Sequence, residues 1–258
     1  MFTWRKSGFY LLLLSLALII YGCSDTSTGP DQNMNPSFNS KTAAGDSAHA
    51  FLSGQQFPIL SVEIDYMAGY EPDQQALDSL ESFLQRHLNK TTINIGLPTS
   101  IPGGGQNAYS ASDIISLEEQ HRDHYTDAQS DTLWAYLIIV DGEYNTQNVL
   151  GIAYYNTSMG FFGETIHNNS GGTGQPPRYK MEAIVFNHEF GHNLGLVNNG
   201  SPMQQDHQDE AHGKHCDVEE CLMYYTVETT DFFANLFDGS IPDLQQFCNA
   251  DLDANGGS

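Results

Sequence analysis

The chain has 258 residues, of which 40% are hydrophobic, and its 32 acidic residues outnumber its nine lysines and arginines to give a formal charge of −23. A charge of this sign argues against nucleic acid as a partner, because proteins that bind phosphate backbones present basic faces. The length is sufficient for one domain with a substantial core.

The N-terminus has the layout of an export signal. Arg5 and Lys6 precede an apolar run over residues 8–20, and Cys23 follows a small residue. The run is short for a membrane span, which needs about 20 residues. The sequence before Cys23 resembles a bacterial lipobox, which implies that residues 1–22 are a signal peptide and that Cys23 carries a lipid.

A lipid on Cys23 would anchor the protein in the cell envelope, and Ser24 after the cysteine favours the outer membrane or cell surface. Removal of the leader leaves seven basic against 32 acidic residues, a charge of −25. Residues 23–55 are rich in Ser, Asn, Asp, Gly and Pro, which predicts a flexible tether, with a short propeptide as the alternative. Residues 56–258 are then the folded domain.

The first predicted elements alternate between strand and helix. Residues 59–66 alternate apolar and polar side chains, as in a strand with one buried face. Residues 73–88 carry leucines on one helical stripe, and residues 91–97 predict a second strand. Ser112 can cap a second helix that runs to about residue 125.

The following elements complete the expected sheet. Residues 133–140 are almost continuously apolar, as in a central strand buried on both faces. Residues 149–156 and 160–166 predict two more strands, of which the second, interrupted by glycine, is expected at an edge. A loop over 168–177 leads into a helix that starts near Arg178. This order predicts an α/β layer.

Residues 188–192, HEFGH, fit the pattern H-E-x-x-H. On a helix, His188 and His192 lie on one face about 6 Å apart along the axis, so both imidazoles can bind one zinc ion. Glu189 would face a water that zinc acidifies toward a pKa of about 7. Gly195 could end the helix in a left-handed conformation. The alternative is an amphipathic helix with two incidental histidines.

The longer pattern H-E-x-x-H-x-x-G-x-x-H belongs to the metzincin clan of zinc peptidases, and residues 188–195 resemble it. The resemblance implies an α/β fold with a twisted, mostly parallel sheet, an antiparallel edge strand above the cleft, supporting helices, a zinc helix and a Met-turn. It also implies that an edge strand near residues 160–165 could hold an extended peptide. The clan's third histidine is replaced by Asn198, whose amide oxygen is a poor zinc ligand.

A downstream segment resembles the H-C-x4-C-x-M tail of archaemetzincins, and its residues are His215, Cys216, Cys221 and Met223. This implies that an insertion has moved the third histidine along the chain, from six to 23 residues after His192. Closing the longer loop costs only about 1.2 kcal/mol more, whereas a structural zinc site contributes about 10 kcal/mol. His215 is therefore favoured as third ligand, with His212, His207 and Asn198 as alternatives.

Two further residues match positions of the clan. Met223 corresponds to the methionine of the Met-turn, which supports the ligands by packing; a core methionine that fills a gap is the alternative. Tyr225 lies where some metzincins place a tyrosine that stabilises the oxyanion, and a packed core tyrosine is its alternative.

The remaining cysteines are Cys216, Cys221 and Cys248. Archaemetzincins use cysteines for a second zinc, completed by a later C-x-x-C, but this chain has only Cys248 there. In an oxidising setting we therefore expect a disulfide involving Cys216 or Cys221 rather than a second zinc.

Residues 141–148 offer oxygens from Asp141, Glu143 and Asn145, and some metzincins bind structural calcium. The segment lacks the full spacing of a calcium loop, which favours a plain hairpin turn.

The expected function is a zinc-dependent endopeptidase, with Glu189 as general base and a protein or peptide as substrate. The alternatives are an aminopeptidase, or a non-catalytic surface lipoprotein whose zinc only stabilises the fold. The membrane is expected as a partner through Cys23, and the oligomeric state stays open.

Overall fold

The computed structural model describes residues 38–233 and 240–258. The expected signal peptide, Cys23 and the first part of the expected tether lie outside the described residues. Within the described ranges, none of the helices combines the length and the hydropathy that crossing a bilayer requires.

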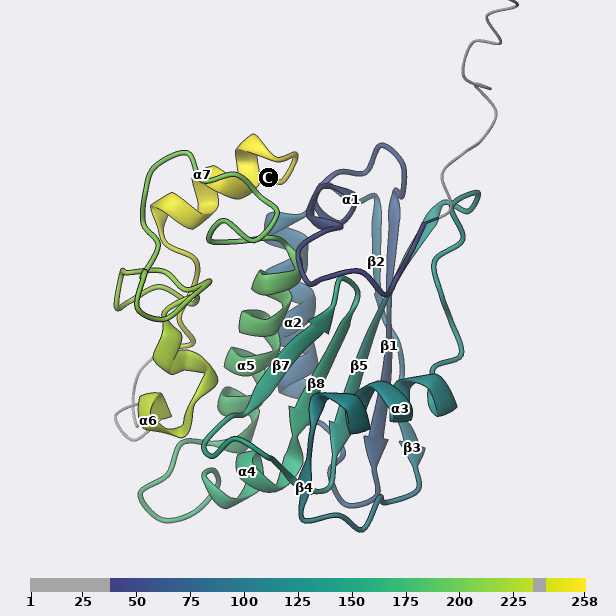
Figure 1. Cartoon of the computed structure of the whole chain (residues 1–258), viewed down its shortest axis with the longest axis vertical. Coiled ribbons are helices and arrows are strands. Elements are labelled where there is room, and N and C mark those ends of the chain that lie inside the picture. Colours follow the sequence, from purple (N-terminus) through teal and green to yellow (C-terminus); the bar gives the residue numbers. More distant parts are fainter. Residues whose placement is uncertain (1–37, 234–239) are drawn as a thin grey trace, which may run out of the picture. The chain divides into compact units, whose positions relative to one another are not determined.

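A mostly parallel sheet forms the centre of the fold, with strand order β2-β1-β5-β8-β7 (Figure 1). Only β7 runs antiparallel to its neighbour, at one edge. A short strand, β3, also pairs with β1, and β4 pairs with β6 in a separate two-stranded sheet. The strands are β1 (Ile59–Met67), β2 (Thr92–Ile95), β3 (Thr99–Ile101), β4 (Ala108–Tyr109), β5 (Thr132–Val140), β6 (Glu143–Tyr144), β7 (Gly151–Tyr155) and β8 (Ser158–Phe162).

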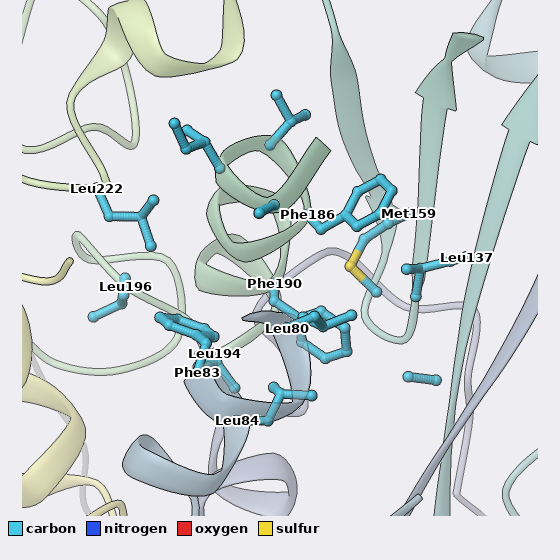
Figure 2. Packing of buried hydrophobic residues seen from close by; sticks show 14 of the residues in the cluster. Leu80, Phe83, Leu84, Leu137, Met159, Phe186, Phe190, Leu194, Leu196 and Leu222 are labelled. Atoms are coloured by element: carbon cyan, nitrogen blue, oxygen red, sulfur yellow. The ribbon is translucent and has the colours of Figure 1, made fainter. Parts of the chain in front are cut away.

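Helices cover both faces of the sheet. On one face, α2 (Gln74–His87) and α5 (Arg178–Asn193) pack against each other and over the strands (Figure 1). Figure 2 shows Phe186 of α5 beside Met159 of β8, with Leu137 of β5 beyond them. On the other face, α3 (Ala111–His121) contributes Ile114 to a separate cluster of buried hydrophobic side chains. The predicted α/β class, with a mostly parallel sheet backed by helices, is confirmed.

Five short helical elements complete the described chain. Two of them, η1 and α6, follow His215 in the sequence. The elements are α1 (Ala48–Leu52), α4 (Gly163–Asn168), η1 (Tyr225–Glu228, a 3-10 helix), α6 (Thr230–Phe233) and α7 (Gln246–Ala254).

The predicted edge strand over residues 160–166 is wrong. β8 lies inside the sheet between β5 and β7 and is buried throughout, and Gly163–Asn168 forms α4. The glycines that indicated an edge are instead sites of close packing. A Cβ at Gly163 would meet the Tyr70 ring at 2.4 Å, and one at Gly160 would meet Ile114 at 3.0 Å. The strand at this edge of the sheet is β7, which runs antiparallel to β8.

The helix predicted to be capped by Ser112 begins slightly earlier. Ser110 is the N-cap, and its hydroxyl and the Asp113 carboxylate satisfy each other's backbone N–H groups as a capping box. The helix ends at His121, before the expected residue 125, since Arg122 has an extended conformation.

The expected tether ends earlier than residue 55, because the chain is packed from Phe38 onward. Phe38 contacts the ring of Phe57 edge to face, and Phe51 and Leu52 of α1 are fully buried. The ammonium of Lys90 holds this segment to the domain by donating to the carbonyls of residues 50, 53 and 57 at 2.6–2.8 Å. Residues 38–55 are therefore part of the domain.

The Lys90→Met variant tests this attachment. Because it leaves three carbonyls without their donor, we expect the free energy of unfolding to fall by about 2–4 kcal/mol, measured by urea denaturation. Lys41→Met is the control, since Lys41 forms an exposed pair with Glu119 at 3.0 Å and such pairs contribute at most about 1 kcal/mol. Equal losses for the two variants would contradict the assignment.

Candidate metal centres

Helix α5 presents His188 and His192 one turn apart, with their Nε2 atoms 3.2 Å apart. Two nitrogen ligands about 2.0–2.1 Å from a tetrahedral zinc are roughly 3.3 Å apart, so this spacing fits one metal ion. The helix ends at Asn193, and Gly195 follows with a φ of +74°. The predicted left-handed turn at Gly195 is confirmed.

His215 lies beside these two histidines, as the spacing argument favoured. Its ring centroid is 5.3 Å from that of His188 and 5.0 Å from that of His192. All three side chains are buried or nearly so, and their ligand atoms lie within 4.8 Å of one another. This group could hold a metal ion.

Backbone carbonyls orient two of the three imidazoles. Nδ1 of His188 donates to the carbonyl of Leu222 at 2.7 Å, and Nδ1 of His215 donates to the carbonyl of His212 at 2.7 Å. With Nδ1 protonated, the lone pair is on Nε2, which faces the other histidines. Nε2 of His215 has no hydrogen-bond partner within the described chain. The orientation is the one that metal binding requires.

Glu228 is a fourth member of this group that the sequence analysis missed. Its Oε2 lies 3.5 Å from Nε2 of His215 and 3.9 Å from Nε2 of His188. The backbone of Glu228 is fixed next to β7, because its carbonyl accepts from the N–H of Leu150 at 3.0 Å. No recognisable spacing links Glu228 to the histidine pattern, so only the fold reveals it.

Glu189 faces the same region from the helix. Its carboxylate is buried, and its Oε1 has no partner among the described residues. The backbone N–H of Ala153 in β7 donates to the carboxylate. β7 comes this close because residue 151 is glycine, since a Cβ there would meet Glu189 Cγ at 2.9 Å.

The environment shifts the pKa values of the cluster in opposite directions. Burial lowers the pKa of His188 to about 4, aided by the charge of His215, and it lowers that of His192 strongly. Burial also lowers the pKa of His215, but the neighbouring Glu228 carboxylate outweighs it and leaves this pKa raised. Burial raises the pKa of Glu189, and the nearby charge of Glu228 adds to the effect. A bound cation would reverse this for Glu189 by favouring its ionised form.

Met223 packs against helix α5. It is fully buried, and a Cβ at Gly191 would meet its sulfur at 2.2 Å. The Leu222 carbonyl that orients His188 belongs to the same turn. The turn therefore supports the histidines by packing and by one hydrogen bond.

The other residues considered as third ligand have different positions. Asn198 adopts a left-handed conformation with a φ of +57°, and its carbonyl accepts from Lys214. His212 is 42% exposed and bonds to Asp209. Tyr225 stacks on His212 with ring centroids 3.6 Å apart, and its catalytic role stays a prediction.

A second group of buried ligand atoms lies nearby. His207, Cys216 and Cys248 have ligand atoms within 4.8 Å of one another, and Cys221 Sγ lies 3.6 Å from Cys248 Sγ. The three thiols are free, so the expected disulfide is not formed. Hydrogen bonds from the neighbouring thiols lower the pKa of Cys221.

A carboxylate orients His207 within this group. Nε2 of His207 donates to Asp251 of α7 at 2.8 Å, which leaves Nδ1 to face Cys216 Sγ at 3.3 Å. A carboxylate behind a histidine is a common second shell of metal ligands. His207, which the sequence offered as an alternative third ligand, therefore belongs to this second group. The second group could also hold a metal ion.

A pocket of about 360 Å³ opens onto the histidine group. Its walls include Glu189, His192 and Glu228, together with Ile152 and Ala153 of the edge strand. A larger hollow of about 640 Å³ near the end of β1 contains no clustered metal ligands. Of these two pockets, the smaller one is therefore the one lined by members of the histidine group.

The segment considered for calcium is used differently. Asp141 accepts hydrogen bonds from the Tyr109 hydroxyl and from the N–H of Gly105, and Glu143 pairs with Ala108 in the small sheet. Among the described residues, the groups able to hold a metal do not include these oxygens.

In comparisons with known proteins, no protein-family model matches the chain, and no curated protein is significantly similar to it.

The metal-free protein should lose stability as the pH falls. The folded pKa of His188 is about 4, below the unfolded value of about 6.5, so this contribution is complete above pH 6.5 and is lost as pH falls through 4. The loss is about 3 kcal/mol, measured by urea unfolding in chelator at several pH values. His188→Gln should flatten this slope, and an unchanged slope would contradict it.

Proposed function

We propose that the chain is a zinc-dependent endopeptidase of metzincin type, which hydrolyses peptide bonds outside the cytoplasm. The observation that carries the proposal is the buried Glu189 carboxylate. One of its oxygens is unpartnered, and it lines an open pocket together with His192, whose ring packs against those of His188 and His215. A site that only stabilised the fold would have no use for a carboxylate in that place.

His188, His192 and His215 would hold the zinc, because their convergent Nε2 atoms fit a tetrahedral ion. Zinc, when bound, would acidify a water molecule and polarise a peptide carbonyl. Glu189 would accept a proton from the attacking water and deliver it to the leaving amine. Tyr225 could assist the oxyanion if its ring left His212.

Two features support the metzincin type. An antiparallel edge strand, β7, borders the pocket with Ile152 and Ala153. An extended peptide could add to that edge by backbone hydrogen bonds. A buried methionine, Met223, packs against α5, the helix that carries His188 and His192.

Glu189→Gln tests the mechanism. The amide cannot accept the proton, so we expect peptidase activity to fall by at least about 10²-fold, while metal analysis shows unchanged zinc. His215→Ala should lose the zinc of the histidine group together with the activity, whereas His212→Ala, whose ring lies outside the cluster, should keep that zinc. A Glu189→Gln protein with full zinc and full activity would refute the mechanism.

One observation favours a different class, a non-catalytic lipoprotein with a zinc that only stabilises the fold. Glu228 Oε2 is 3.5 Å from His215 Nε2, and a fourth protein ligand would close the coordination shell. On that alternative, purified protein would contain zinc but cleave no peptide. An aminopeptidase is the other alternative, since Ala43 and Ala44 wall one side of the pocket; it would reject N-blocked peptides.

The second group is proposed as a structural zinc site with His207, Cys216, Cys221 and Cys248 as ligands. One histidine and three thiolates are a common closed set for structural zinc. All four side chains are buried, and burial keeps the site away from substrate. Such a site would stabilise the long segment that delivers His215.

Metal stoichiometry tests this second site. Purified protein should contain two zinc ions per chain, and His207→Asn should contain one and unfold at lower temperature, because structural zinc contributes to folding directly. Asp209→Asn, which alters a carboxylate that contacts the half-exposed His212 and the N–H of Ala211 but no member of the cysteine group, is the control and should keep two ions. A single zinc in the unaltered protein would contradict the assignment.

The leader and Cys23 lie outside the described residues, so the envelope location rests on the sequence alone. We propose that the domain is held at the membrane by a lipid on Cys23.

A further inference from the structure

Among the residues that the structure describes, Lys214 is the only basic side chain other than histidine that lines the pocket beside the histidine group. The pocket otherwise contains the carboxylates of Glu189 and Glu228, and its remaining walls are apolar or neutral apart from His192. In a chain with nine lysines and arginines against 32 acidic residues, a basic group in this position is a conspicuous local feature.

Lys214 differs from most other basic residues of the described domain in lacking an acidic partner. Lys41, Arg86, Arg122 and Arg178 each lie within 4 Å of a carboxylate. Among the side chains that the structure describes, Lys214 has no carboxylate at that distance, and its ammonium donates to the carbonyl of Asn198 at 2.6 Å. An ammonium has three donors, so two remain for a ligand.

A strained turn holds the carbonyl to which Lys214 is attached. Val197 and Asn198 have φ values of +54° and +57°, a conformation that is unusual for a β-branched residue. The side chain of Asn199 fixes the turn by donating to the carbonyls of Ala44 at 3.1 Å and His192 at 3.3 Å. Backbone strain of this kind persists only where the surroundings enforce it, as at functional sites.

We propose that Lys214 is a specificity-determining residue that binds a carboxylate of the peptide substrate. The inference rests on the proposed peptidase function and names a substrate class for it. The carboxylate could belong to an acidic side chain or to the C-terminus of the peptide, because the same ammonium would bind either. Among the side chains that line the pocket, the other charged groups besides His192 are the carboxylates of Glu189 and Glu228, so Lys214 is the group placed to favour an acidic peptide.

Peptide binding without cleavage tests the proposal. The zinc-loaded Glu189→Gln protein is titrated with fluorescent peptides in pairs that differ only by Glu or Gln at one position, or only by a free or amidated C-terminus. We expect about fivefold tighter binding of the acidic member, as for an exposed ion pair. The pair that shows the preference identifies the source of the carboxylate.

The preference should vanish in the double variant Glu189→Gln with Lys214→Gln, and with Lys214→Glu it should change to peptides that carry lysine. Lys180→Gln is the matched control, because it removes the same charge in the first turn of α5, 12 residues or about 18 Å along the helix from His192. It should keep the preference.

Lys214 could instead only fasten the turn at Asn198. In that case Lys214→Gln would weaken the binding of both members of each pair equally, which would overturn the proposal, as would equal binding of both members by the parent protein. Cleavage of neutral peptides by the zinc-loaded chain with Glu189 intact would show that the proposed function survives either result. Binding of no peptide of either kind would overturn both proposals.

Discussion

The structure depends on the convergence of three imidazole nitrogens at a buried point. Nε2 of His188 and Nε2 of His192 are 3.2 Å apart, and with Nδ1 of His188 and of His215 occupied by backbone carbonyls the inward atoms of these two rings are lone pairs. Buried acceptors that face one another without a donor are unfavourable. A bound cation would relieve that repulsion, so the arrangement of the three rings is suited to holding a metal ion.

The segment between Val197 and His215 contributes candidate ligands and supporting groups to both clusters. His207 faces the thiols, the carbonyl of His212 orients His215, and Lys214 faces the pocket. Most of its side chains are exposed, whereas Ser201 and His207 are buried. A long segment between two candidate ligands can therefore carry chemically important side chains of its own.

The sequence predicted the features that depend on local patterns. Alternation identified β1, continuous hydrophobicity identified β5, and the spacing of His188 and His192 placed both on one helical face. Features that depend on packing between distant segments were missed: the interior position of β8, the attachment of residues 38–55 and the approach of Glu228. Gly160 suggested an edge strand, and the prediction was wrong because the local sequence does not show which side chain packs against that glycine.

His215 and Cys216 are neighbours in the chain, yet they belong to different groups of ligand atoms. Adjacent Cα atoms are 3.8 Å apart, so neither residue can shift far without the other. An ion bound by the group of Cys216 would therefore also fix the position of His215, so that the two groups could not be occupied or emptied independently.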